Sequence, residues 1–146
     1  MTDVIVREFG EPDRAAVVEL WRGCGLLRPW NDPHLDIDRK LAVDDSMFLV
    51  AAIGNVVVGS LMAGYDGHRG WINYLAVDPA RHRSGIGRLL MHHAEQRLAD
   101  AGCPKINLQI RIDNSGAAAF YERLGFATDD AISMGKRLVV DTAPVR

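Results

Sequence analysis

The stretch Trp71–Leu90 limits what this 146-residue chain can fold into more than any other segment. An apolar run ends in a turn at Asp78 and Pro79, and a basic, arginine-rich loop follows. Gly85 and Gly87 then lead into an apolar pattern with helical spacing. The first N–H groups of a helix have no partner inside it, and its dipole favours an anion there. Because glycines also let the main chain approach a phosphate closely, this order of strand, loop and helix predicts a phosphate-binding site.

Length and composition indicate one globular domain over residues 1–146, with a hydrophobic content of 48%. The net charge of −2 does not support attraction to nucleic acid or to an anionic membrane surface, so the local basic cluster suits a small anionic ligand. No run is apolar enough to be a signal peptide or to span a membrane. The two cysteines imply no disulfide framework, and we expect a cytoplasmic protein with reduced thiols.

Apolar periodicity predicts strands and helices along most of the chain. In the first half we expect a strand at Val4–Phe9, a helix at Asp13–Cys24, a short helix that Asp36 can cap at Asp36–Leu41, and strands at Met47–Ile53, Val56–Tyr65 and Trp71–Val77. In the second half we expect a helix at Ile86–Ala101, a strand at Ile106–Ile112, a helix between Asn114 and Gly125, and one or two closing strands between Phe126 and Val140. The Gly54-Asn55 connection indicates a hairpin, and the helix between two strands indicates a parallel pair, so the fold class is mixed α/β.

Two segments of the second half carry a family resemblance. The first is the loop HRSGIG at His82–Gly87, and the second is NSGAAAFYERLGF at Asn114–Phe126. In this order, with a helix and a strand between them, they resemble the GNAT superfamily of acetyl-CoA-dependent N-acetyltransferases. The segments LLRPWNDP and GYDGHRG also look like its small bacterial YpeA-like branch. The resemblance implies a GNAT-like fold: a mixed, mostly antiparallel sheet of six to seven strands, about four helices, and a parallel strand pair splayed at the cofactor site.

The resemblance implies acetyl-CoA as the co-substrate. Backbone amides of the glycine loop would hold the pyrophosphate, and the strand end at Leu75–Val77 would bind the pantetheine amides like an added strand. Asn114 would bind the cofactor arm near the sulfur, in competition with a role as a helix cap. One departure is His82, which stands where the family has glutamine or arginine. The expected cofactor-binding residues are Leu75, Ala76, Val77, His82, Arg83, Ser84, Gly85, Ile86, Gly87, Arg88, Asn114 and Tyr121.

The implied reaction is direct attack of a primary amine on the thioester, with Tyr121 as the general acid that protonates the leaving thiolate. Without the motif, a tyrosine on an apolar helix face is more often a core residue. Attack needs a neutral amine, but no glutamate stands on the strand Trp71–Val77 to act as the base. Asp66 and Asp32 are the candidate bases.

The acceptor is left open between a small molecule and a protein N-terminus. Trp30, Asn31 and Asp32 form the candidate acceptor-binding loop, with plain loop packing as the alternative. His92 and His93 lack the spacing of a metal-binding helix, so no metal is expected. A second hypothesis is a catalytically silent module that binds CoA or acyl-CoA and acts as a sensor or partner domain. Exposed sheet edges make a homodimer a further expectation.

Overall fold

Five strands lie in the sheet in the same order as in the sequence. The structure, a computed structural model, describes residues 3–141. Neighbouring strands are antiparallel except for the last pair, which is parallel. The strands are β1 (Ile5–Glu8), β2 (Phe48–Ile53), β3 (Val56–Tyr65), β4 (Gly70–Val77) and β5 (Ile106–Leu108).

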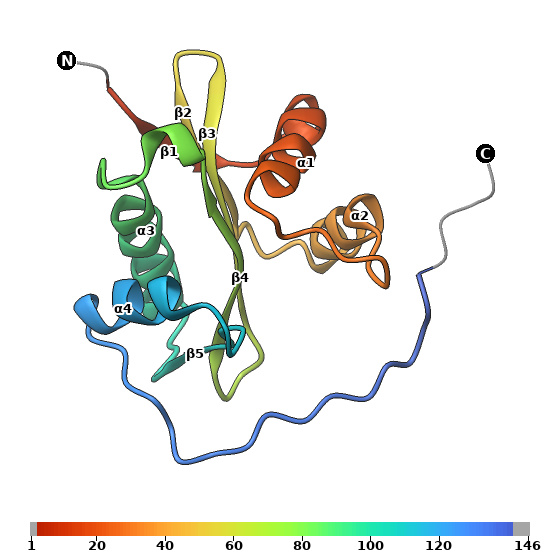
Figure 1. The fold of residues 1–146 in the computed structure, drawn as a ribbon, viewed down its shortest axis with the longest axis vertical. Coiled ribbons are helices and arrows are strands. Elements are labelled where there is room, and N and C mark those ends of the chain that lie inside the picture. The colour runs from red at the N-terminus through yellow and green to blue at the C-terminus, as the bar shows by residue number, and fades with distance from the viewer. Residues whose placement is uncertain (1–2, 142–146) are drawn as a thin grey trace.

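Helices cover both faces of this sheet (Figure 1). One face carries α1 (Arg14–Gly23) and α2 (Pro33–Val43), and the other carries α3 (Ile86–Asp100) with α4 (Ser115–Arg123) beside it. The side chains of β2 alternate between two cores: Phe48 and Val50 pack toward α1, whereas Leu49 and Ala51 pack toward α3. A strand that is buried on both faces reads as a continuous apolar run, which explains the composition of this one.

The parallel pair is short, and its divergence positions the candidate site. Only residues 70–72 of β4 pair with residues 106–108 of β5. Beyond that point β4 has a register shift against β3, and Tyr74 has a φ of 53° in the middle of the strand. A bulge of this kind bends its strand and re-aims its side chains. Among residues 3–141, no strand therefore pairs with the edge of β4 at residues 75–77 on the β5 side.

Most expected elements form close to their predicted bounds. The hairpin at Gly54-Asn55 is confirmed as the connection between β2 and β3, and the helices after Gly85 and Asn114 are confirmed as α3 and α4. The short helix is longer than expected, and Asp32 rather than Asp36 caps it, because the Asp32 side chain accepts hydrogen bonds from the first amides of α2. No helix among residues 3–141 is long and apolar enough to cross a membrane.

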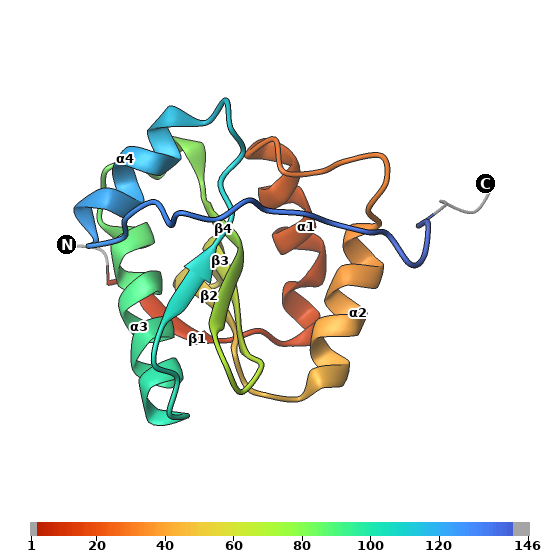
Figure 2. The ribbon, with the colours of Figure 1, turned by 90° about the horizontal axis from the view of Figure 1, so that it is seen from below.

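The expectation of six to seven strands was wrong, since the described chain has five. The strand expected at Ile106–Ile112 pairs only over β5, and the closing strands expected between Phe126 and Val140 do not form. Residues 126–141 instead run as an extended segment from α4 past β5 to α2 (Figure 2). Alternating apolar residues predict an extended chain but do not predict which strand it pairs with. Met134, one of the alternating apolar residues of this segment, is 90% exposed and therefore packs against no sheet.

Candidate functional site

The beginning of α3 presents a row of unpartnered backbone amides. Gly85 is the N-cap residue with a φ of 86°, and Arg83 before it has a φ of 65°. Among the described residues, no backbone or side-chain group accepts a hydrogen bond from the amides of residues 83–88. A Cβ added to Gly87 would lie 3.1 Å from Cζ of Phe120, so the glycine allows α4 to pack closely on this end of α3. The geometry is that of an anion-binding helix terminus.

The free edge of β4 begins beside this loop, at the carbonyl of Val77. The amide of Asp78 donates to the carbonyl of Val58 on β3 at 2.8 Å. The two groups of a trans peptide unit point in opposite directions, so the Val77 carbonyl points away from β3 and toward the open edge. There it accepts hydrogen bonds from Sγ of Cys24 at 3.2 Å and from Nε2 of His82 at 3.0 Å.

Helix α4 brings Asn114 and Tyr121 to the same side of the molecule. Oδ1 of Asn114 accepts from the amide of Ala117 at 3.0 Å, so its role as a helix cap is confirmed. Tyr121 lies half-buried between the rings of Phe120 and Phe126. Burial raises the pKa of Tyr121 to about 12, so its hydroxyl is protonated at neutral pH. Tyr121, Phe120, Leu75 and Val77 all pack against the core beneath α3.

Asp66 lies away from this group and is occupied by its own turn. Oδ1 accepts from the amides of His68 at 2.8 Å and Arg69 at 2.7 Å, and Oδ2 accepts from Nε1 of Trp71 at 3.2 Å. These hydrogen bonds, first of all the one from Arg69, hold the pKa of Asp66 below its usual range. A carboxylate stabilised in this way is a weak proton acceptor.

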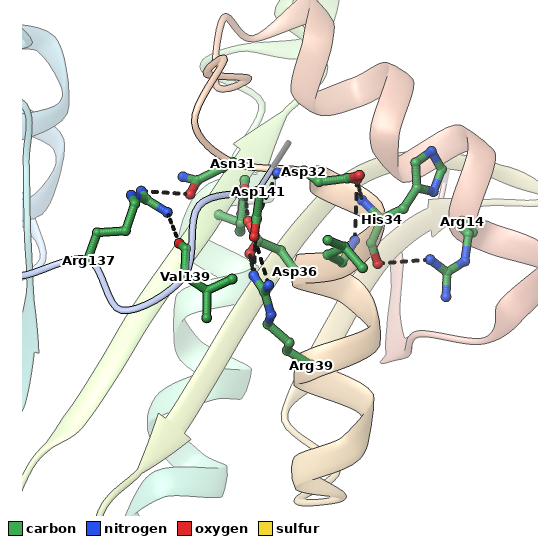
Figure 3. A network of polar contacts seen from close by, with 11 residues as sticks. Arg14, Asn31, Asp32, His34, Asp36, Arg39, Arg137, Val139 and Asp141 are labelled. Atoms are coloured by element: carbon green, nitrogen blue, oxygen red, sulfur yellow. Dashed lines mark hydrogen bonds and ion pairs between the residues drawn. The ribbon is translucent and has the colours of Figure 1, made fainter. Parts of the chain in front are cut away.

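The loop at Trp30–Asp32 meets the C-terminal segment (Figure 3). Oδ1 of Asn31 accepts from Arg137 at 3.1 Å, and the amide of Asp32 donates to Asp141 at 3.0 Å. Arg39 on α2 donates to both oxygens of Asp141, at 3.1 and 2.8 Å. An open hollow of about 610 Å³ lies beside these contacts, lined by Arg39 and residues 135–139. The loop is thus part of a wall shared by α2 and the C-terminal segment.

Sequence reasoning missed a polar pair at the bulge. The hydroxyl of Tyr74 donates to Oδ2 of Asp36 on α2, and the Tyr74 ring stacks on Trp21 with centroids 3.8 Å apart. Beneath it, the Ser60 hydroxyl accepts from Nε1 of Trp21 at 2.8 Å and donates to the Tyr74 carbonyl at 3.0 Å. No pattern in the sequence marks this pair, because the bulge that turns Tyr74 toward α2 has no signature of its own.

The structure therefore brings the loop at residues 82–88, the free edge at residues 75–77 and α4 together. It places the Asn31–Asp32 loop and the Tyr74–Asp36 pair on the opposite face of the sheet, with α1 and α2, and leaves Asp66 in a separate turn. Within residues 3–141, no three histidine, cysteine or acidic side chains gather in a way that suits a metal ion.

Comparison with known proteins gives consistent matches. The model of the "Acetyltransferase (GNAT) family" matches residues 14–126. An acetyltransferase of Pectobacterium atrosepticum is 48% identical over 136 residues, which cover 93% of this chain and 96% of that protein. Ard1 from Thermoplasma volcanium is similar in structure, with a TM-score of 0.69 and 25% identity over 85% of this chain and 82% of that one. The PaiA N-acetyltransferase of Thermoplasma acidophilum, solved with coenzyme A, has a TM-score of 0.75 and 17% identity over 89% of this chain and 93% of its own.

Proposed function

The chain belongs to the acetyltransferase (GNAT) family, and on that premise we propose that it moves an acetyl group from acetyl-CoA to a primary amine. The observation that carries the proposal is the row of unpartnered amides at residues 83–88, placed directly beside the free edge of β4. The row of amides is suited to a pyrophosphate, and the free strand edge is suited to the amides of a pantetheine arm. A single extended ligand with both parts fits this arrangement.

In the proposed complex the pyrophosphate lies on the loop before α3, and the pantetheine arm follows the main chain from Val77 toward Leu75. The thioester then lies near the bulge at Tyr74, where β4 and β5 have diverged. Asn114 keeps its helix cap through Oδ1 and offers its amide nitrogen to the cofactor arm. His82 takes the place of the usual glutamine or arginine in this loop.

The proposed chemistry needs no enzyme nucleophile. The amine nitrogen attacks the thioester carbon, the C–N bond forms, and the C–S bond breaks to release a thiolate. Tyr121 donates its hydroxyl proton to that thiolate, and its raised pKa keeps the proton available at neutral pH. The attacking nitrogen loses a proton to a base on the acceptor side.

For that base we add Asp36 to the candidates. Asp66 and Asp32 both use oxygens to hold backbone amides, Asp66 in its turn and Asp32 at the start of α2. Asp36 faces the bulge, where the Tyr74 hydroxyl donates to Oδ2, and Arg39 on the same helix lies 3.5 Å from Oδ1. We place the acceptor on this face, between the bulge and the wall formed by the Trp30–Asp32 loop. The acceptor itself is either a small amine or a protein N-terminus.

Two measurements on the full-length protein test the proposal. Calorimetric titration with CoA gives the affinity, and a thiol-reactive dye follows CoA release from acetyl-CoA in the presence of small primary amines, amino acids and short peptides with free N-termini. Amine-dependent thiol release is the expected result. Tight CoA binding without release from any acceptor would favour the silent CoA-binding module, and absence of CoA binding would overturn both functions.

We also propose a cytoplasmic homodimer. Both cysteines are free, which fits a reducing compartment. Light scattering on the purified protein at several concentrations gives the mass in solution, and a monomer mass throughout would contradict the dimer.

A further inference from the structure

We propose that the acceptor is a small amine that also carries an anionic group, a carboxylate or a phosphate, and that the cationic hollow beside α2 binds this group. The cationic hollow is the open space of about 610 Å³ lined by Arg39 and residues 135–139. The inference rests on the proposed function and names the chemical class of its acceptor. It gives a role to Lys136 and Arg137, which take no part in the proposed transfer step.

The lining of the cationic hollow contains three basic side chains and no acidic one. The basic residues are Arg39, Lys136 and Arg137, and the others are glycine, leucine and valine. Asp141 binds Arg39 through both carboxylate oxygens, but its own side chain is buried, so it compensates that charge without facing the hollow. Among residues 3–141, no carboxylate lies within ion-pair distance of Lys136 or Arg137. Their positive charges are therefore left for a ligand anion.

The guanidinium of Arg137 is held in place by neutral groups, as Figure 3 shows. Nη2 donates to Oδ1 of Asn31 at 3.1 Å, and Nη1 donates to the Val139 carbonyl at 3.4 Å. A guanidinium has five N–H groups in a planar fork, so these two contacts leave others for the oxygens of a carboxylate or phosphate. Because the side chain is already oriented, less conformational entropy is lost when an anion binds.

The cationic hollow adjoins the carboxylate that we propose as the base. Asp36 lies three residues before Arg39 on α2, a rise of about 4.5 Å along the helix, and its Oδ1 is 3.5 Å from Nη1 of Arg39. The negative charge of Asp36 and the positive charge of Arg137 therefore lie along the same wall (Figure 3). A molecule with an amine at one end and an anion at the other matches this order of charges. A dibasic amine would instead place its second charge against Lys136 and Arg137.

The test compares acceptors that differ in charge. CoA release from acetyl-CoA is followed with 3-aminopropanoate and 5-aminopentanoate, with the uncharged amide of each, with 2-aminoethyl phosphate and with 1,4-diaminobutane. Each amine has its own pKa, so the informative quantity is the change in kcat/KM between the wild type and Arg137→Gln for one acceptor at a time. The carboxylate and phosphate arms show which anion the cationic hollow prefers.

We expect Arg137→Gln to lower kcat/KM for an anionic acceptor by roughly ten- to hundredfold, mainly through KM, because hydrogen bonds to charged groups are the stronger ones. The amide acceptors should lose little, and CoA affinity should stay unchanged. Arg137→Lys keeps the charge and should retain part of the preference for an anion. Arg22→Gln is the matched control, since it removes an exposed arginine that pairs with Glu19 on α1, and it should behave as the wild type.

An equal loss with charged and uncharged acceptors would make Arg137 an anchor of the C-terminal segment only and would overturn the proposal. A wild-type preference for the amides, for the diamine or for peptides without an acidic side chain would overturn it as well. Saturation-transfer NMR of 5-aminopentanoate with the CoA-saturated protein gives a readout that does not depend on turnover. Binding that Arg137→Gln abolishes, without thiol release from any acceptor, would support the anion site and defeat the proposed transfer. Absence of both binding and release would overturn the anion site.

Discussion

The hydroxyl of Tyr74 lies 2.6 Å from Oδ2 of Asp36, which joins the bulge of β4 to the first turn of α2. Burial, followed by the neighbouring Asp36 carboxylate, raises the pKa of Tyr74, so the phenol is a neutral donor to a charged acceptor. The carboxylate is thereby held in one orientation on the face where we place the acceptor amine. This makes Asp36 the carboxylate best oriented to take a proton from that amine.

Replacement of Asp36 tests this role. Asp36→Asn keeps the size of the side chain but removes the base, so the turnover of acetyl-CoA with an active amine should fall by about 10²-fold or more. CoA affinity should stay unchanged. Steady-state rates and CoA titrations measure the two quantities.

The control for that experiment is Asp38→Asn. Asp38 lies on the same helix and pairs with Arg14 on the surface, so its loss should leave the rate near that of the wild type. Tyr74→Phe removes only the orienting hydrogen bond and should give an intermediate loss. A wild-type rate in Asp36→Asn would remove Asp36 from the mechanism.

A side chain at Gly85 should weaken CoA binding more than it weakens the fold. Gly85 has a φ of 86°, and Gly102 at the other end of α3 has a φ of 88°, so alanine is strained by a similar amount at either position, about 1–2 kcal/mol. Only Gly85 lies among the proposed phosphate-binding amides. Thermal melts should show similar losses for Gly85→Ala and Gly102→Ala, whereas CoA titration should show a large loss for Gly85→Ala alone. Equal CoA affinities in the two variants would refute the assignment of the loop.

Tyr121→Phe should lower turnover by about 10²-fold while CoA affinity changes little, because the hydroxyl acts on the leaving thiolate and not on the bound cofactor. The ring keeps its contacts with Phe120 and Phe126, so the variant should fold normally. Tyr65→Phe is the matched control, since the Tyr65 hydroxyl donates to the Gly67 carbonyl, away from the loop at residues 82–88. Rates and CoA titrations on both variants decide the matter, and an undiminished turnover would exclude Tyr121 as the acid.

The contacts of Asp141 with Arg39 and Asp32, which anchor the C-terminal segment, should make the free energy of unfolding depend on pH. Hydrogen bonds from Arg39 and then from the amide of Asp32 lower the pKa of Asp141 from 3.8 to about 2. A carboxyl group with a lowered pKa in the folded state stabilises the fold above its unfolded pKa, and this contribution is lost as the pH falls from about 4 toward 2. Asp141→Asn should therefore be less stable than the wild type at pH 7, and the difference should shrink toward pH 2. Denaturant unfolding at several pH values measures it.

A second anchor provides the comparison for Asp141. Asp129 pairs with Lys105 at 2.9 Å on the surface, where ion pairs contribute little. Asp129→Asn should therefore unfold as the wild type does across the same pH range. If Asp141→Asn matched it at every pH, the C-terminal segment would not be held by Asp141.

The sequence predicts the cofactor half of the site better than the acceptor half, for a physical reason. Gly85 and the Asn114 cap act locally, because each fixes the main-chain conformation within a few residues. Their structural roles can therefore be predicted from the sequence alone. The Tyr74–Asp36 pair joins positions 38 residues apart through a bulge, and bulges follow from register between strands. Asp66 and Asp32 are chemically plausible bases in the sequence, but only the structure reveals that Oδ1 of each accepts hydrogen bonds from backbone amides.

The missing closing strands have a related cause. The alternation Ile132, Met134 has the period of a strand, yet the segment is held by side-chain anchors, including those at Asp129 and Asp141, rather than by a ladder of backbone hydrogen bonds. Periodicity reports which way side chains point along an extended chain. Whether a neighbouring edge pairs with it depends on contacts that no local pattern encodes.

The divergence of β4 from the edge strand β5 exposes unpaired backbone at residues 75–77, and such an edge invites other chains to add to it. Cys24 and His82 occupy the Val77 carbonyl at this edge, and a carbonyl already bonded twice offers nothing to an incoming strand. The same two side chains therefore leave the Val77 end of this edge less able to accept a strand from another chain.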